Sequence, residues 1–201
     1  MKNKAKMKNF ETGLPEGYRE VYAIDAAEKR IGLIFNTVAL ALAFVIGIII
    51  FAAIDIESYF EMLDKDTFLI YWLILVVGMI VYIVAHELVH GAAYKLLTHR
   101  KLTFGLKWSC AYCGVPDIYV YRRASLISLL APFVVFNIVF LLPMIFWTGS
   151  PMRLNCCLWF IVHNAGCVGD LYVAILYLTK FRSPAYLMRD TGPKQTFYIN
   201  E

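Results

Sequence analysis

The sequence predicts an all-α membrane protein in which four transmembrane helices form a single domain. Two observations lead to this prediction. Of the 201 residues, 60% are hydrophobic and 17% are charged, and the mean hydropathy is +0.63. The hydrophobic residues are also gathered into four long stretches, and a helix needs about 20 such residues to cross a bilayer.

This composition excludes several classes of protein. A soluble domain of this size buries only about 70% of the surface of its unfolded chain, which is too little to hide so many apolar side chains. A soluble enzyme, a disordered chain and a coiled-coil fibre are therefore excluded, and one membrane-embedded domain over residues 1–201 is expected. The net charge of +4 is small and does not indicate nucleic-acid binding.

The polar segment 1–30 precedes the first apolar run. That run is longer than the roughly 7–15 residues of the hydrophobic region of a signal peptide. We therefore expect no cleavable signal peptide and a polar N-terminal segment that stays in the cytoplasm.

Four segments are predicted to cross the membrane. Each should be a helix, because hydrocarbon offers no partner for an unpaired backbone group, and none has the alternating pattern of a barrel strand. The four segments are Ile31–Ile54, Phe68–Leu97, Ala124–Trp147 and Leu154–Thr179.

The connection between the second and third spans, residues 98–123, is the longest loop. Tyrosine, valine and isoleucine alternate in it on both sides of Pro116-Asp117. This pattern predicts a small β-hairpin with its turn at Pro116-Asp117. The residues that carry the pattern are Val115, Ile118, Tyr119, Val120 and Tyr121.

The distribution of lysine and arginine predicts the orientation. Residues 1–30 contain seven, residues 95–123 six and the tail 180–201 four, which makes 7 + 6 + 4 = 17 on one side. The other two connections contain only Lys65 and Arg153. Because positive loops stay inside, we expect a multi-pass protein of the cell membrane with both termini in the cytoplasm.

Ionisable side chains inside the spans are the most informative residues. Of 15 acidic residues, only Glu87 and Asp170 lie well within a predicted span, and His86, His90 and His163 are intramembrane as well. A carboxylate in this position costs at least about 2.5–3.5 kcal/mol, so it needs a partner or a function.

The second span contains the sequence His86-Glu87-Leu88-Val89-His90. Residues four apart project from one face of a helix, so both imidazoles can bind one ion. Glu87 projects about 100° away, where it can contact a metal-bound water molecule without binding the metal. This H-E-x-x-H pattern is typical of zinc hydrolases, in which the glutamate takes a proton as water attacks a carbonyl.

Asp170 is predicted to be the third metal ligand. Spans two and four run in the same direction, and His86 and Asp170 lie roughly 27 Å and 24 Å into them, at similar depth in the cytoplasmic leaflet. Gly166 and Gly169 favour close helix approach or local unwinding that turns Asp170 towards the metal. His163 lies two turns outward on nearly the same face as Asp170.

The pattern from His86 to Gly91, with an aspartate on a later helix, is similar to the site-2-protease type of intramembrane metalloprotease. It resembles more closely the small bacterial membrane proteins described as putative zincin peptidases. Residues 14–18 are similar to the way those proteins begin, and residues 164–170 are similar to their second motif. Ala131-Pro132 with Asn137 resembles a segment of site-2 proteases, whose motif Asn-x-x-Pro-x-x-x-x-Asp has no proline here.

The resemblance implies a zinc-dependent peptidase that cuts a membrane-associated polypeptide near the cytoplasmic leaflet. By this resemblance His86, His90 and Asp170 bind Zn²⁺ and Glu87 is the general base. Asn164 or His163 is a candidate for contact with the oxyanion or the substrate, through a hydrogen bond that stabilises the tetrahedral intermediate.

Other interpretations remain open. The protein could be a catalytically inactive zinc-binding membrane protein that regulates transmembrane partners, or a transporter with a proton relay through Glu87, Asp170 and His163. Without a metal, the H-E-x-x-H residues could be a polar helix end and Asp170 a helix-packing residue. The lone Cys110-x-x-Cys113 motif favours reduced thiols over a metal or redox site.

Overall fold

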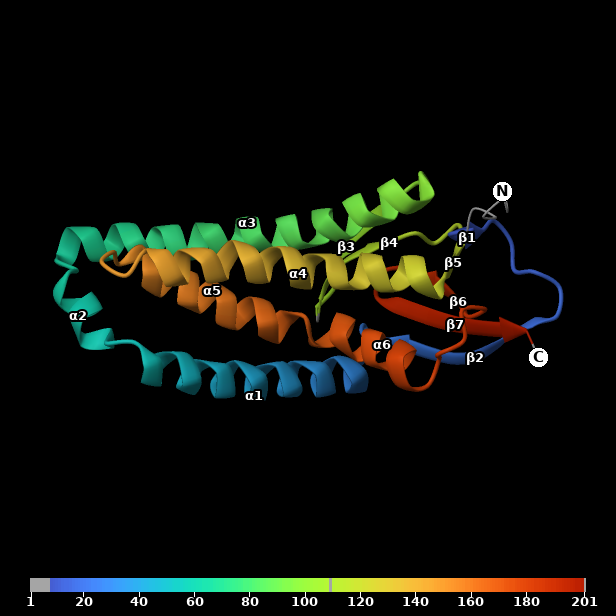
Figure 1. Ribbon diagram of the computed structural model, residues 1–201, viewed down its shortest axis with the longest axis horizontal. Helices are drawn as coiled ribbons and strands as arrows, with labels where there is room; N and C mark the ends of the chain where they lie inside the picture. Colours follow the sequence, from blue (N-terminus) through green and yellow to red (C-terminus); the bar gives the residue numbers. More distant parts are fainter. Residues whose placement is uncertain (1–7, 109, 201) are drawn as a thin grey trace, which may run out of the picture.

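The computed structural model describes residues 8–108 and 110–200 (Figure 1). Helices form an elongated bundle, and an antiparallel sheet lies at one end of it. Within the described ranges the helices are α1 (Lys29–Ala53), α2 (Ile56–Glu61), α3 (Lys65–Thr98), α4 (Arg122–Phe146), α5 (Met152–Gly166) and α6 (Val168–Thr179).

The four predicted apolar segments are helical, with ends that differ by a few residues from those expected. In the described part of the chain, α1, α3 and α4 are each long and apolar enough to cross a membrane. The pair α5 and α6 makes a fourth such span if it is counted as one bent element. Helix α3 begins after Asp64, whose carboxylate accepts a hydrogen bond from the Thr67 backbone N–H at 2.9 Å.

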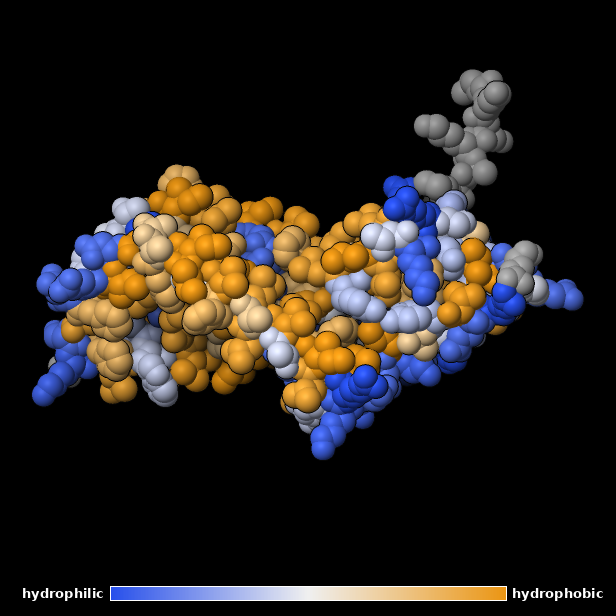
Figure 2. All heavy atoms as spheres, turned by 90° about the horizontal axis from the view of Figure 1, so that it is seen from below, coloured by the Kyte–Doolittle hydropathy of each residue, from blue (hydrophilic) through white to orange (hydrophobic). Residues whose placement is uncertain are grey.

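The outer faces of the helices are apolar. Figure 2 shows hydrophobic side chains over most of the helical part, and hydrophilic ones gathered mainly over the sheet and at the opposite tip. On α1, Leu40 and Phe44 are 73% and 70% exposed. Such a surface is unfavourable in water and is the one expected for helices that face lipid.

The all-α prediction is wrong for the polar ends of the chain. Five strands among the described residues form an antiparallel sheet in the order β1-β5-β6-β7-β2. Strand β2 pairs with β7 from Tyr18↔Asn200 to Asp25↔Lys194. The strands are β1 (Phe10–Glu11), β2 (Tyr18–Asp25), β5 (Tyr119–Tyr121), β6 (Leu187–Asp190) and β7 (Lys194–Asn200).

The predicted N-terminal segment and tail are therefore parts of one folded layer. The pairing joins residues more than 150 positions apart, so a local sequence pattern cannot reveal it. Tyr177, Phe181, Met188 and Phe197 are buried where the sheet packs on α6, and this apolar contact attaches the layer to the bundle.

A β-hairpin is present in the loop between α3 and α4, but not at the predicted position. Its strands are β3 (Thr103–Leu106) and β4 (Ala111–Gly114), so its turn lies before Pro116-Asp117. The predicted second strand, Tyr119–Tyr121, is instead β5 and pairs with β1 and β6.

The fourth span is bent by 48° at Cys167, between α5 and α6. The break lies between Gly166 and Gly169, where the sequence predicts close helix approach or local unwinding. Asp170 consequently lies in the first turn of α6. Helix α1 runs beside α5 and α6 and packs on both of them (Figure 1).

Candidate metal centre

His86 and His90 lie one turn apart on α3 and are both buried, at 8% and 7% exposure. Their ring centroids are 5.0 Å apart. The four-residue spacing therefore places two imidazoles on one face, as the sequence predicts.

Asp170 faces both histidines from α6. Its Oδ2 atom lies 3.4 Å from His86 Nε2 and 3.2 Å from His90 Nε2. The bend at Cys167 starts a new helix at this point, and an acidic residue in the first turn is favoured by the helix dipole. The two histidines of α3 thus meet the Oδ2 atom of Asp170, which is about 80 residues away in the chain.

These three side chains fit a zinc ion. Each offers one ligand atom, and the ligand atoms all lie within 4.8 Å of one another. Ligands around tetrahedral zinc with bonds of about 2.0–2.1 Å are separated by about 3.3–3.4 Å. The two nitrogen-to-oxygen distances of 3.4 Å and 3.2 Å are close to this separation, and imidazole and carboxylate are the donors that zinc prefers in catalytic sites.

His90 is oriented by a backbone carbonyl of α4. Its Nδ1 atom lies 2.8 Å from the Ser128 carbonyl oxygen, so Nδ1 carries the proton and donates it. The residue four positions after Ser128 is Pro132, which lies inside α4 and has no N–H. The Ser128 carbonyl therefore lacks its helical donor and accepts the imidazole N–H instead. This contact directs Nε2 of His90, the nitrogen that would bind a metal, towards the Asp170 carboxylate.

His86 is oriented by Tyr82, one turn earlier on α3. His86 Nδ1 lies 3.2 Å from the Tyr82 hydroxyl, which lies 2.9 Å from Nδ1 of His163. His163 Nε2 lies 3.3 Å from the Phe133 carbonyl oxygen and donates to it. The Asn137 amide nitrogen lies 3.3 Å from the same Nε2 atom and donates to the Phe133 carbonyl as well. With Nε2 of His163 protonated, His86 donates to Tyr82 and Tyr82 donates to His163. His86 Nε2 then keeps its lone pair for a metal.

Glu87 lines a cavity of about 130 Å³ together with the three candidate ligands. It also lines a larger cavity of about 420 Å³ that lies between α1, α3, the β3–β4 hairpin and the bend between α5 and α6. The Cys113 backbone N–H of β4 faces the Glu87 carboxylate. Glu87 therefore lies beside the three candidate ligands and faces the larger cavity as well.

The β3–β4 hairpin covers the site because two glycines permit close packing. A Cβ atom at Gly91, next to His90, would lie 2.8 Å from the Phe104 ring of β3. A Cβ atom at Gly114, at the end of β4, would lie 2.4 Å from the Gly192 backbone nitrogen. The hairpin thus fits between α3 and the turn that joins β6 to β7.

Asp190, at the end of β6, is a buried acid beside the site that the sequence analysis missed. Its carboxylate accepts hydrogen bonds from the Tyr94 hydroxyl at 2.6 Å and from the Gly192 N–H at 2.9 Å. Burial raises the pKa of Asp190 to about 6, although these two hydrogen bonds lower it. Asp190 lines the smaller cavity, so the sheet contributes directly to the site.

Tyr82 and Tyr94 were also missed, although a sequence signal was present. Residues 82, 86, 90 and 94 follow one another at four-residue spacing and form one stripe on α3. For Asp190 there was no such signal, because it reaches the site through strand pairing.

His163 and Asn164 lie in the network around Tyr82. His163 is fully buried, and the Asn164 amide donates to Asn137 Oδ1 at 3.2 Å and to the Phe160 carbonyl at 2.9 Å. Asn137 in turn donates to the Phe133 carbonyl at 2.7 Å. The role of His163 and Asn164 in contacting an oxyanion or substrate stays a prediction.

Cys110 and Cys113 form no disulfide in the part of the chain that the structure describes. Burial raises the pKa of the Cys113 thiol to about 12, so it is protonated at neutral pH. The preference for reduced thiols over a metal or redox site at Cys110 and Cys113 stays a prediction.

The fold and the site define a helical H-E-x-x-H protein in which an aspartate from a second helix joins the two histidines. A sequence model of the family described as "putative zincin peptidase" matches residues 78–186, which is more than half of the chain. The chain belongs to this family. The matched region contains His86, Glu87, His90 and Asp170, the hairpin, α4, α5 and α6. Nothing among the curated proteins or the solved structures matches the chain.

Membership of this family implies a metallopeptidase with zinc as its metal. The donor set of two imidazoles and one carboxylate agrees with that implication.

Proposed function

We propose that the protein is a zinc-dependent intramembrane peptidase that hydrolyses peptide bonds of a membrane-associated polypeptide near the cytoplasmic leaflet. One observation carries the proposal. His86, His90 and Asp170 converge to distances suited to zinc, with Glu87 beside them, on helices apolar enough to cross a membrane.

The orientation of the site follows from charge. In the sequence, 17 of the 19 lysines and arginines fall in the segments 1–30, 95–123 and 180–201. The described parts of these segments form the sheet, the hairpin and the adjoining helix ends. The positive-inside rule places these segments in the cytoplasm, with both termini. A site at the cytoplasmic end of the membrane helices would be a further similarity to site-2 proteases.

His86, His90 and Asp170 would hold the zinc ion, which would supply a water molecule with a lowered pKa and a positive charge to polarise the peptide carbonyl. Glu87 takes a proton from the attacking water and returns it to the leaving amine, as a general base and then a general acid. Ser128 and Tyr82 hold the two imidazoles through their Nδ1 atoms, which leaves both Nε2 lone pairs for the metal.

The substrate is proposed to enter through the larger cavity. This cavity is lined by α1, α3, the hairpin and the bend between α5 and α6, and Glu87 and His86 are among its lining residues. A helix with side chains is about 10–12 Å across, and an extended chain is narrower and exposes its peptide bonds. We therefore expect the substrate to be locally unwound where it is cut.

The test compares fragments of membrane proteins in cells that produce the wild type or Glu87→Gln. Glu87→Gln removes the base but not a ligand, so the purified variant should keep its zinc and lose at least 100-fold in cleavage. Glu57→Gln, an acidic position on α2 away from the site, is the matched control and should cleave like the wild type.

Mass spectrometry of the fragments identifies the cut positions. Fragments that require Glu87 and end in segments near the cytoplasmic leaflet support the proposal. If Glu87→Gln and the wild type give the same fragments while zinc is bound, the inactive zinc-binding alternative is correct.

A further inference from the structure

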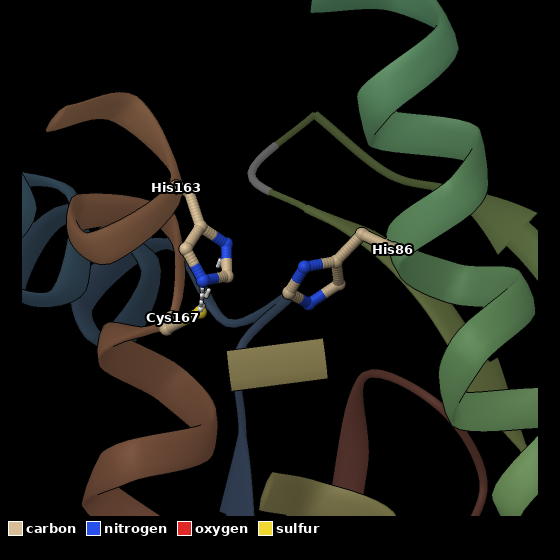
Figure 3. Close-up of side chains that lie close together, drawn as sticks. All are labelled: His86, His163 and Cys167. Carbon is tan, nitrogen blue, oxygen red and sulfur yellow. Dashed lines mark hydrogen bonds between the residues drawn. The ribbon is translucent and has the colours of Figure 1, made fainter. Parts of the chain in front are cut away.

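A second group of buried metal-binding side chains lies next to the candidate zinc site, at the bend between α5 and α6. It consists of His86, His163 and Cys167, and we call it the Cys167 cluster (Figure 3). His163 and Cys167 are four residues apart across the bend, the same spacing as His86 and His90 on α3. Figure 3 shows the His163 ring facing the His86 ring, with the Cys167 sulfur beside His163.

The distances in the Cys167 cluster suit a metal ion. One ligand atom from each of the three residues lies within 4.8 Å of the others, and Cys167 Sγ is 3.7 Å from His163 Nδ1. For tetrahedral zinc with bonds of about 2.3 Å to sulfur and 2.0–2.1 Å to nitrogen, the sulfur-to-nitrogen separation is about 3.6 Å. The Tyr82 hydroxyl, 3.2 Å from His86 Nδ1 and 2.9 Å from His163 Nδ1, offers a fourth donor.

The surroundings of the cluster favour a soft cation. His163 and Cys167 are both fully buried, and the rings of Phe133, Phe136 and Phe140 surround His163. Thiolate and imidazole select zinc and cadmium over magnesium, calcium and manganese, which prefer oxygen ligands.

His86 belongs to both the Cys167 cluster and the His86–His90–Asp170 set. Its Nε2 atom faces Asp170, and its Nδ1 atom faces Tyr82 and the cluster. A neutral imidazole has one nitrogen with a lone pair, and the other nitrogen carries the proton. His86 can therefore bind a metal in only one of the two sets at a time.

We propose that His86, His163 and Cys167 form a second, thiolate-containing site for a soft divalent cation, whose occupation excludes a metal from the His86–His90–Asp170 set. The site rests on its own geometry and does not require that the protein be a peptidase. An ion in the Cys167 cluster withdraws His86 and leaves His90 and Asp170 as the remaining pair. Excess soft metal would thereby switch the catalytic set off.

The test titrates the metal-free, detergent-purified full chain with Cd²⁺ and follows thiolate-to-cadmium charge-transfer absorption in the ultraviolet. The wild type is expected to bind one Cd²⁺ per chain and to develop the absorption. Cys167→Ser should still bind one Cd²⁺, through His86, His90 and Asp170, but without the absorption. Asp170→Asn should keep the absorption in full, because the competing set has lost a ligand.

Two further variants separate metal binding from general damage to the fold. His163→Gln retains Cys167 but removes a ligand, so the Cd²⁺ concentration for half-maximal absorption should rise at least tenfold. Cys157→Ser removes another buried thiol, outside the cluster, and should titrate like the wild type.

The proposal is overturned if Cys167→Ser develops the same absorption as the wild type at one equivalent of Cd²⁺. It is also overturned if Asp170→Asn loses the absorption. Tight binding of two Cd²⁺ ions by the wild type would overturn it as well, because both sets would then hold an ion at once, although His86 can bind a metal in only one of them. None of these results depends on peptide cleavage, so the proposed function can fail while the second site stands.

Discussion

His90 Nδ1 donates a hydrogen bond of 2.8 Å to the carbonyl oxygen of Ser128, a backbone group that Pro132 leaves without its helical donor. A proline in one helix thus orients the imidazole of a candidate metal ligand on another helix. A partner of this kind fixes the ring and its tautomer, and losing one typically weakens metal binding about 10–100-fold.

Pro132→Ala restores an N–H that competes for the Ser128 carbonyl. We expect zinc to bind about tenfold more weakly, while the metal-free protein is no less stable, because the α4 backbone gains a hydrogen bond. Zinc affinity is measured by competition with a chelator in the Cys167→Ser background, where the second site is absent.

Pro143→Ala is the matched control for this substitution. Pro143 lies in the same helix, and the carbonyl it frees belongs to Val139, whose side chain is 48% exposed on the outer face. Zinc affinity should not change in this variant. An unchanged affinity in Pro132→Ala as well would show that the Ser128 contact does not support the metal site.

Asp190 makes the stability of the sheet depend on pH. Its pKa is raised from 3.8 to about 6 in the folded protein, so the folded state binds more protons than the unfolded state between these values. The contribution of Asp190 therefore stabilises the fold at or below about pH 4 and is lost as the pH rises through 6, by up to about 3 kcal/mol.

Asp190→Asn should abolish this dependence, because the amide does not titrate. The measurement is thermal unfolding of the metal-free wild type and variant at pH values from 4 to 7. The difference in melting temperature, wild type minus variant, should decrease as the pH rises. A difference that is constant over this range would contradict a raised pKa for Asp190.

Gly114→Ala should separate the hairpin from the β6–β7 turn. The added Cβ would lie 2.4 Å from the Gly192 backbone nitrogen, and backbone cannot move aside as a flexible side chain can. We expect a loss of about 1–3 kcal/mol in the free energy of unfolding, as for other overpacked sites.

Gly149→Ala is the control for Gly114→Ala, because a Cβ at Gly149 meets nothing within 4 Å. Both proteins are compared by chemical unfolding in the same detergent. Equal stability of the two variants would mean that the close contact between Gly114 and Gly192 does not constrain the fold.

The sequence was sufficient to predict the four apolar helical segments, but not the short helix α2, and to predict that His86, His90 and Asp170 come together. A membrane helix has a fixed rise, so the depth of a residue follows from its position in an apolar run. Two rare acids at similar depth, Glu87 and Asp170, are informative because their burial is costly.

The sheet and the groups behind the ligands could not be predicted in this way. Strands β2 and β7 are short and come from opposite ends of the chain, and no local period shows that they pair. The Ser128 carbonyl is a backbone atom with no signature of its own, and only the position of Pro132 four residues later indicates that it is available.

The zinc content and zinc affinity of the purified protein test the central claim most directly. Both are measured in the Cys167→Ser background, with and without Asp170→Asn. Asp117→Asn, at an acidic position in the loop between α3 and α4, is the control. We predict about one zinc per chain for the parent and the control, and at least a tenfold weaker affinity when Asp170 is changed. Equal zinc affinity with and without the Asp170 carboxylate, or no zinc in the parent, would contradict a metal held between α3 and α6.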